Sequence, residues 1–221
     1  PMNEQVMETE PVGKLFVSLA VPSVISQIVN LLYSAVDRMY VGHIPGNGTT
    51  ALTALGVCVP IITLVSSFAQ LVSSGAAPLA SIYLGKGQRQ HAEQILGNSF
   101  SAMVLMSIFL TAVLLCFTEP ILTVFGASNA TMPYAASYLR IYACGTIFVL
   151  LTLGLNAFIM AQGFSKISMI TVLIGAISNI ILDPLFIYFF NTGVRGAACA
   201  TILSQAISAA WALRFFARHT G

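Results

Sequence analysis

Six long apolar stretches dominate this sequence, and they restrict it to folds that a lipid bilayer can hold. They run over Leu15–Val41, Ala51–Leu84, Glu93–Phe117, Met132–Ala161, Ser165–Phe190 and Val194–Ala217. A helix needs about 20 predominantly apolar residues to cross the hydrocarbon core, and each stretch is long enough. Because a helix satisfies its own backbone polar groups, the sequence predicts an all-α integral membrane protein with six transmembrane helices.

The composition excludes a soluble domain. Of the 221 residues 57% are hydrophobic and only 7% are charged, whereas a typical soluble domain has about 25% charged residues. The formal net charge is only +2, and the sequence has no basic cluster, so no nucleic-acid partner is expected. The partner that the composition does imply is the lipid bilayer.

Basic residues in the loops predict the orientation of the helices. With the N-terminus inside, one external loop carries Arg195, and the cytoplasmic side carries Lys14, Lys86, Arg89, Lys166, Arg214 and Arg218. Lys and Arg collect on the cytoplasmic side of membrane proteins. Both termini are therefore expected in the cytoplasm, with residues 1–14 as a cytoplasmic segment ahead of a transmembrane unit over 15–217.

Two acids lie inside the predicted spans, Asp37 in the first and Asp183 in the fifth. An ionisable side chain at mid-helix costs roughly 2.5–3.5 kcal/mol on insertion scales, so it normally faces protein or water. Under the predicted orientation both acids lie in the outer half of the membrane. We therefore expect them to share one functional layer, although Asp37 at the headgroup boundary and Asp183 in a structural role are the alternatives.

The first span has a polar face. Ser23, Gln27, Asn30, Ser34 and Asp37 recur at steps of three or four residues, which places them on one side of a helix. Pro22 removes a backbone hydrogen bond at the inner end of this face and is a candidate hinge. The candidates for lining a substrate cavity are Gln27, Asn30, Tyr33, Ser34 and Gln70. Tyr33 is explained equally well as a core or interface anchor.

The fifth and sixth spans add oxygen ligands. Asn179 and Asp183 are four residues apart and therefore stack on one helix face. Thr201 of the sixth span adds a hydroxyl. Hard oxygen ligands suit a small cation such as Na⁺, and a carboxylate in a membrane also suits a proton. The Ser and Thr stripes of the second and sixth spans are, by themselves, ordinary helix-packing surfaces.

Several motifs together resemble one transporter family. They are Pro22–Gln27, Ala35-Val36-Asp37-Arg38-Met39-Tyr40-Val41-Gly42, Ala54-Leu55-Gly56, Gly85-Lys86-Gly87, Gln162-Gly163, Asn179–Pro184 and Gly193–Ala198. In order and spacing, over about the whole chain, they are similar to the N-terminal lobe of the multidrug and toxic compound extrusion (MATE) family. Members of that family have about twelve spans in two six-helix lobes.

The resemblance implies an antiporter of the bacterial cytoplasmic (inner) membrane that expels organic cations and drugs while Na⁺ or protons run inward. It places Asp37, Asn179, Asp183, Thr201 and, more weakly, Asn156 in the coupling-cation site. No enzyme activity and no cofactor other than the coupling ion are expected. A second six-helix lobe is required, supplied by the same longer chain or by a second copy, and residues 218–221 would be the truncated linker to it.

Three alternatives stay open, one of them a purely structural or assembly subunit with no site of its own. A lipid-linked saccharide flippase of the same superfamily would need more cationic residues in its central cavity than this sequence offers. An intramembrane aspartyl protease would also use two aspartates on neighbouring spans, but Val36 precedes Asp37 and Leu182 precedes Asp183 where that class has Tyr-Asp and Gly-x-Gly-Asp.

Overall fold

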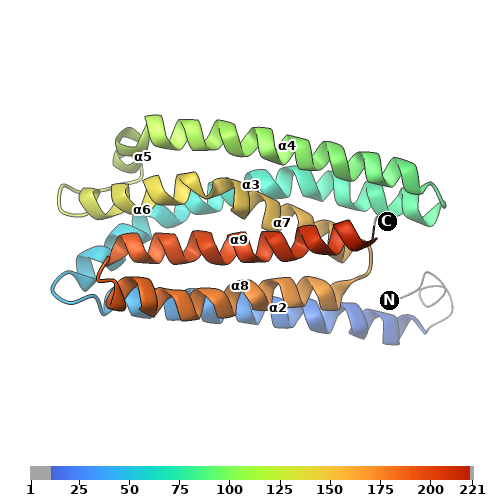
Figure 1. The fold of residues 1–221 in the computed structure, drawn as a ribbon, viewed down its shortest axis with the longest axis horizontal. Helices are drawn as coiled ribbons and strands as arrows, with labels where there is room; N and C mark the ends of the chain where they lie inside the picture. Colours follow the sequence, from blue (N-terminus) through green and yellow to red (C-terminus); the bar gives the residue numbers. More distant parts are fainter. Residues whose placement is uncertain (1–10, 220–221) are drawn as a thin grey trace.

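The computed structural model describes residues 11–219, and they form a bundle of long helices (Figure 1). The helices are α2 (Val12–Gly42), α3 (Gly48–Gly85), α4 (Arg89–Cys116), α5 (Thr118–Val124), α6 (Met132–Cys144), α7 (Thr146–Ala161), α8 (Ser165–Pro184), a π-helical turn η1 (Leu185–Phe189) and α9 (Val194–His219). No strand occurs within 11–219. The all-α prediction is confirmed, while most of the predicted segment 1–14 and the chain end after 219 lie outside the described residues.

The predicted spans agree with the helices to within a few residues, with one correction. Five helices are long and apolar enough to cross a membrane, and a sixth span results if α6 and α7 count as one. The sequence predicted one continuous helix over Met132–Ala161, but α6 and α7 meet at an angle of 58°. The prediction also missed the short helix α5.

The break between α6 and α7 is at Gly145. The Ile202 side chain of α9 occupies the space where a Cβ of residue 145 would lie, so the two backbones approach closely. Next to the break, Thr111 of α4 donates a hydrogen bond of 2.8 Å to the Ala143 carbonyl. A bent helix is tolerated in a membrane where neighbouring side chains bond the freed backbone groups in this way.

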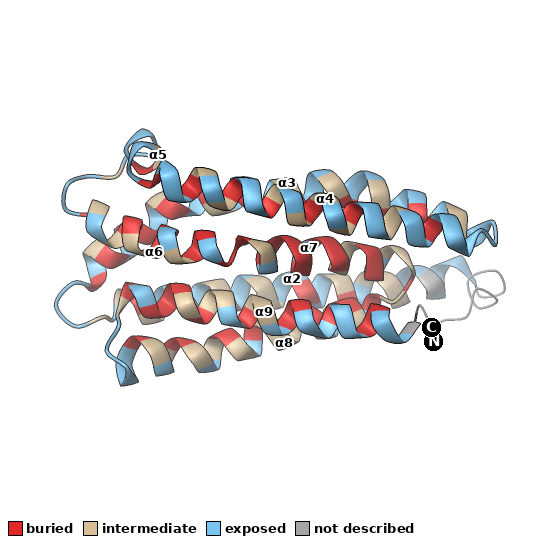
Figure 2. Ribbon diagram, turned by 45° about the horizontal axis from the view of Figure 1, so that its top comes forward, coloured by how far each residue is buried: buried red, intermediate tan, exposed pale blue. Residues whose placement is uncertain are grey.

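Helix α9 lies in the middle of the bundle, packed on α6, α7 and α8. Helix α2 packs mainly against α8, and α3 packs against α4 and α7 (Figure 1). Figure 2 shows buried residues concentrated on α7 and along the inner side of α9. Large apolar side chains on the outer surface, such as Leu31 of α2 and Phe109 of α4, remain exposed, as a bilayer-facing surface requires.

Three hydroxyl side chains donate hydrogen bonds to backbone carbonyls of neighbouring helices. Ser208 of α9 donates to the Thr171 carbonyl of α8 at 3.1 Å, and Thr152 of α7 donates to the Gln205 carbonyl of α9 at 2.9 Å. Ser81 of α3 donates to the Ala161 carbonyl at 2.7 Å. Small residues with such bonds let membrane helices approach closely.

Gly196 is a point of close backbone approach between α9 and η1. A Cβ at this position would lie 2.7 Å from the Phe186 carbonyl carbon, which cannot move without shifting η1. We expect Gly196→Ala to destabilise the protein by about 1–3 kcal/mol, the usual cost of overpacking. Thermal unfolding of the detergent-solubilised protein would measure this as a lower melting temperature.

Gly75→Ala is the matched control, because a Cβ at Gly75 of α3 meets nothing within 4 Å. This substitution should leave the melting temperature unchanged or slightly higher, since alanine favours a helix over glycine. Equal melting temperatures for the two variants would contradict the close approach at Gly196.

Candidate functional site

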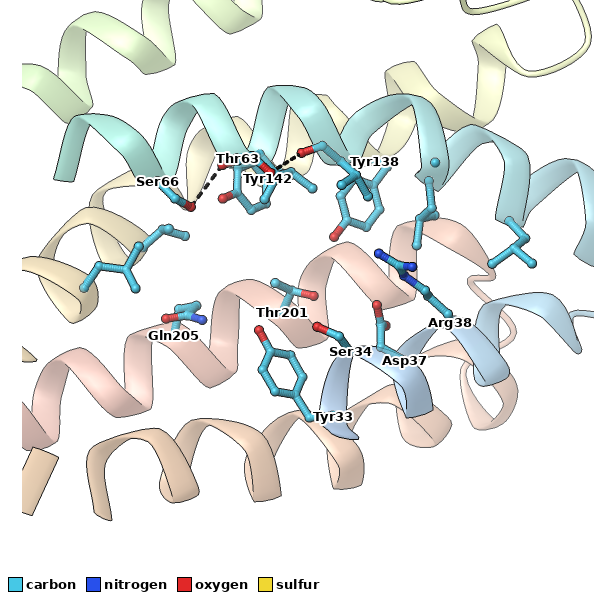
Figure 3. A pocket seen from close by; sticks show the side chains of 17 residues that line it. Tyr33, Ser34, Asp37, Arg38, Thr63, Ser66, Tyr138, Tyr142, Thr201 and Gln205 are labelled. Atoms are coloured by element: carbon cyan, nitrogen blue, oxygen red, sulfur yellow. Dashed lines mark hydrogen bonds between the residues drawn. The ribbon is translucent and has the colours of Figure 1, made fainter. Parts of the chain in front are cut away.

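A cavity of about 670 Å³ opens among α2, α3, α6, α7 and α9. Its walls combine apolar side chains from α3 and α7 with polar and phenolic ones from α2, α3, α6 and α9. Figure 3 shows the polar members, which are Tyr33, Ser34, Asp37, Arg38, Thr63, Ser66, Tyr138, Tyr142, Thr201 and Gln205. The cavity can therefore offer both charge and aromatic surface to a ligand.

Asp37 of α2 and Asp183 at the end of α8 come together at the edge of this cavity. Asp37 lines the cavity, while Asp183 is completely buried behind it. Their carboxyl groups are close enough for one, when protonated, to donate a hydrogen bond to the other. Two carboxylates so placed, one buried and one half-buried, repel each other unless a proton or a cation neutralises at least one of them.

Asn179 places an amide beside this acidic pair. It is 1% exposed, and its Nδ2 donates a hydrogen bond of 3.4 Å to Asp183 Oδ1. Three buried oxygens around the pair have no hydrogen-bond partner among the described residues, namely Asp37 Oδ1, Asn179 Oδ1 and Asp183 Oδ2. Unpartnered buried oxygens are costly, and here they form the kind of acceptor set that a small cation uses.

Thr201 faces the cavity from α9, and Asn156 does not line it. Thr201 donates its hydroxyl hydrogen to the Ala197 carbonyl at 2.9 Å, so its oxygen still has capacity to accept. Asn156 of α7 is half-buried, and its Oδ1 also lacks a partner in the described part of the chain. Within residues 11–219 there is no group of three His, Cys, Asp or Glu side chains that could together hold a metal ion.

The other predicted positions divide into two sets. Tyr33 and Ser34 line the cavity. Gln27 and Gln70 are exposed, Asn30 is half-buried, and none of these three lines the cavity. Pro22 is buried within α2, which continues through it as one helix, so its role as a hinge stays a prediction.

Tyr138, Tyr142 and Arg38 are cavity residues that the sequence reasoning did not select. The two tyrosines are four residues apart on α6 and stack with their ring centroids 6.3 Å apart. Their i,i+4 spacing is a signal for a shared helix face, but it does not say which face meets a cavity. Arg38 lies at the outer end of its span, where a long basic side chain often reaches to water, so its sequence position gives no signal for a cavity.

A π-helical turn directly follows Asp183. Pro184 ends α8, and η1 then carries Tyr188, whose hydroxyl donates a hydrogen bond of 2.7 Å to the Tyr40 carbonyl of α2. The two rings also meet edge to face, with centroids 6.2 Å apart. This contact therefore joins the two helical segments close to Asp37 on one side and Asp183 on the other.

Known proteins resemble this chain over nearly its full length. The MatE family profile matches residues 22–185. The chain is 27% identical over 211 residues to the multidrug export protein MepA of Staphylococcus haemolyticus, covering 96% of this chain and 46% of that protein. It thus spans about half the length of the relatives that it matches.

Solved structures show the same relation. One described as "protein A" is 31% identical, with a TM-score of 0.89 over 96% of this chain and 47% of its own. A structure of "MATE in the straight conformation" has 24% identity and a TM-score of 0.85, over 94% of this chain and 46% of that chain. The second likeness supports the fold alone, and both place the six-span bundle in about half of a larger chain.

The contact between Tyr188 and Tyr40 generates a prediction about local stability. Tyr188→Phe removes one hydrogen bond while keeping the ring contact, so we expect a loss of about 1 kcal/mol. The loss should be local to the end of α2, and hydrogen exchange of the amides of residues 39–43 should become several-fold faster.

Tyr134→Phe is the control for this experiment, because Tyr134 of α6 is half-buried and its hydroxyl makes no hydrogen bond to any described residue. Unchanged exchange at residues 39–43 in Tyr188→Phe, or equally faster exchange in both variants, would contradict a specific tie between η1 and α2.

Proposed function

The chain belongs to the MatE family, and we propose that it is the N-terminal, cation-coupling lobe of a secondary antiporter that exports organic cations and drugs. Its relatives named MepA are multidrug export proteins. The family, the six-span bundle and an acidic pair beside a large cavity support a transport role for this half of the protein, and no enzyme is named among these relatives.

The single observation that carries the proposal is the meeting of Asp37 and Asp183 at the cavity edge. Only Asp37 reaches the cavity, and Asp183 is held behind it with Asn179. Charge that enters from the cavity therefore meets Asp37 first, and the buried partners stabilise it there. Na⁺ would use the free oxygens of Asp37, Asn179 and Asp183, with Thr201 as a fourth candidate.

Occupancy of this pair would change the packing of α2 on α8. An empty pair holds two repelling carboxylates at the interface of these helices, whereas a proton or Na⁺ between them removes the repulsion. Because Tyr188 joins η1 to α2 close to the pair, movement of either helix would be transmitted to the other. A ligand shifts an equilibrium between two states only if it binds one of them more tightly. The acidic pair would bind a proton or Na⁺ with different affinity in the two packings of α2 on α8.

Transport itself would need the second lobe, because alternating access rocks one lobe against the other around a central site. The first span begins and the last span ends on the same side of the bundle (Figure 1). By the distribution of Lys and Arg that side is the cytoplasm of a bacterial cell. The alternatives gain no support: Arg38 is the one cation among the described cavity residues, too few for a saccharide pyrophosphate.

Calorimetric titration of Na⁺ into the purified protein across a range of pH tests this proposal. We expect saturable Na⁺ binding that weakens as the pH falls, because protons compete for the same carboxylates. Asp37→Asn and Asp183→Asn should each abolish it. If protons are the coupling ion, Na⁺ gives no signal, and instead a proton uptake near neutral pH vanishes in the same two variants.

Glu119→Gln is the matched control, because Glu119 is an exposed acid that pairs with Arg140 at 3.1 Å, away from the cavity. It should bind like the unsubstituted protein. If neither ion signal exists, or if both persist after Asp37 and Asp183 are neutralised, the acidic pair is structural and the coupling role is wrong.

A further inference from the structure

A second cavity, of about 330 Å³, lies among α4, α7 and α9, close to the end of the bundle where α4 begins and α9 ends. We call it the α4–α9 groove. Leu155 and Phe216 are buried in it, Leu96 and Phe100 are half-buried, and Leu213 is 39% exposed, so the groove opens to the outer surface. Apart from one acid, its lining residues in the described chain are apolar.

The groove faces away from the large cavity. Val149 and Leu153 of α7 line the large cavity, whereas Leu155 of the same helix lines the groove. With about 3.6 residues per turn, Leu155 leaves α7 on the side opposite to those two residues. Helix α4 lies along one edge of the bundle (Figure 1) and contributes none of the described residues of the large cavity. A second lobe that rocks across a central site would therefore leave the groove to lipid.

Gly97 gives the groove part of its depth. A Cβ at this position of α4 would meet nothing within 4 Å, so the space beside the glycine is open. Glycine within a helix costs roughly 0.5–1 kcal/mol relative to alanine, and here no close approach of another backbone accounts for it. Open space along an apolar groove fits a thin, flexible hydrocarbon chain.

The acid in the groove, Glu93, belongs to an ion pair at the membrane surface. Its Oε1 accepts a hydrogen bond of 3.0 Å from Arg89 Nε, and both side chains are about half exposed to solvent. Helix α4 begins at Arg89, and from Glu93 to Phe100 it rises by about 10 Å. The groove therefore runs from the depth of the lipid headgroups into the hydrocarbon.

The basic residues near this end of α9 do not line the groove. Leu213 and Phe216 are three residues apart and share the groove side of α9. Arg214 and Arg218 leave the helix on its other side, because they are out of step with these two residues. The charges at the mouth of the groove are thus one carboxylate and the guanidinium paired with it.

From these observations we propose that the α4–α9 groove binds one phosphatidylethanolamine molecule, with an acyl chain beside Gly97 and the headgroup on the pair of Arg89 and Glu93. The ammonium donates to the Glu93 carboxylate, which has about four acceptor sites, and the phosphate accepts from Arg89. The neutral, zwitterionic headgroup matches a neutral pair of charges. Phosphatidylcholine has no N–H to donate, and phosphatidylglycerol has no cation to offset Glu93.

Native mass spectrometry of the purified protein in detergent tests this proposal. The probes are synthetic phosphatidylethanolamine, phosphatidylcholine and phosphatidylglycerol with identical oleoyl chains, so only the headgroup differs. We expect saturable binding of one phosphatidylethanolamine, about 3- to 10-fold tighter than that of the other two lipids. This is the usual effect of one charged hydrogen bond at a partly exposed site.

Gly97→Leu fills the groove and should weaken binding of phosphatidylethanolamine by about 10-fold or more, since the acyl chain loses its place. Gly75→Leu is the matched control, because a Cβ at Gly75 of α3 also meets nothing within 4 Å and this residue does not line the groove. It should bind lipid like the unsubstituted protein. Equal melting temperatures of the two variants establish that both are folded.

Glu93→Gln tests the headgroup separately. It keeps the shape of the side chain but removes its charge, so phosphatidylethanolamine should bind no better than phosphatidylcholine. Glu119→Gln is the control, because Glu119 is an exposed acid paired with Arg140 and lies outside the groove. It should keep the preference for phosphatidylethanolamine.

Four results would overturn the inference: no saturable lipid binding, equal binding of the three lipids, tighter binding of phosphatidylglycerol, or unchanged binding in Gly97→Leu. None of them depends on the ion coupling of Asp37 and Asp183. The groove can hold its lipid while the acidic pair is only structural, and the acidic pair can bind an ion while the groove shows no lipid preference.

Discussion

Two carboxyl groups brought together inside a membrane bundle are the interaction on which the rest of this structure depends. Asp37 and Asp183 come from helices that pack along one another, and lipid offers neither charge a partner. The surrounding chain places polar groups beside the two acids. Asn179 bonds Asp183, and Tyr188 ties the next turn to α2. Several oxygens still lack partners, which marks a site that can accept a cation rather than a finished core.

The remaining helices supply a frame that holds the pair at the edge of a cavity. Helix α9 packs against α6, α7 and α8, and its contacts use small residues and hydroxyl-to-carbonyl bonds. Such contacts let the helices approach closely. The hydrophobic effect contributes little to helix association inside a bilayer, because lipid tails are themselves apolar. The bend at Gly145 lets α6 place Tyr138 and Tyr142 on the cavity while α7 continues against α3 and α9. A straight helix over Met132–Ala161 would be less able to make both sets of contacts.

Arg38 and Asp37 place opposite charges at adjacent positions of α2. Both side chains line the cavity, and Asp37 also meets Asp183 of α8. Because consecutive residues on a helix point about 100° apart, the two charged side chains leave α2 in different directions. Any movement of α2 would therefore move both charges together.

Hydropathy and charge alone determined the class, the spans to within a few residues, and the two acids, because lipid penalises polar groups so strongly that they stand out in the sequence. The polar face of the first span also led to Ser34 and Asp37, but it could not separate them from Gln27, which faces outward. Only the tertiary structure showed the break at Gly145, the position of Tyr138 and Tyr142 on the cavity wall, and the direction of the Arg38 side chain into the cavity. Each depends on which neighbour a helix face meets, and helical periodicity contains no information about neighbours.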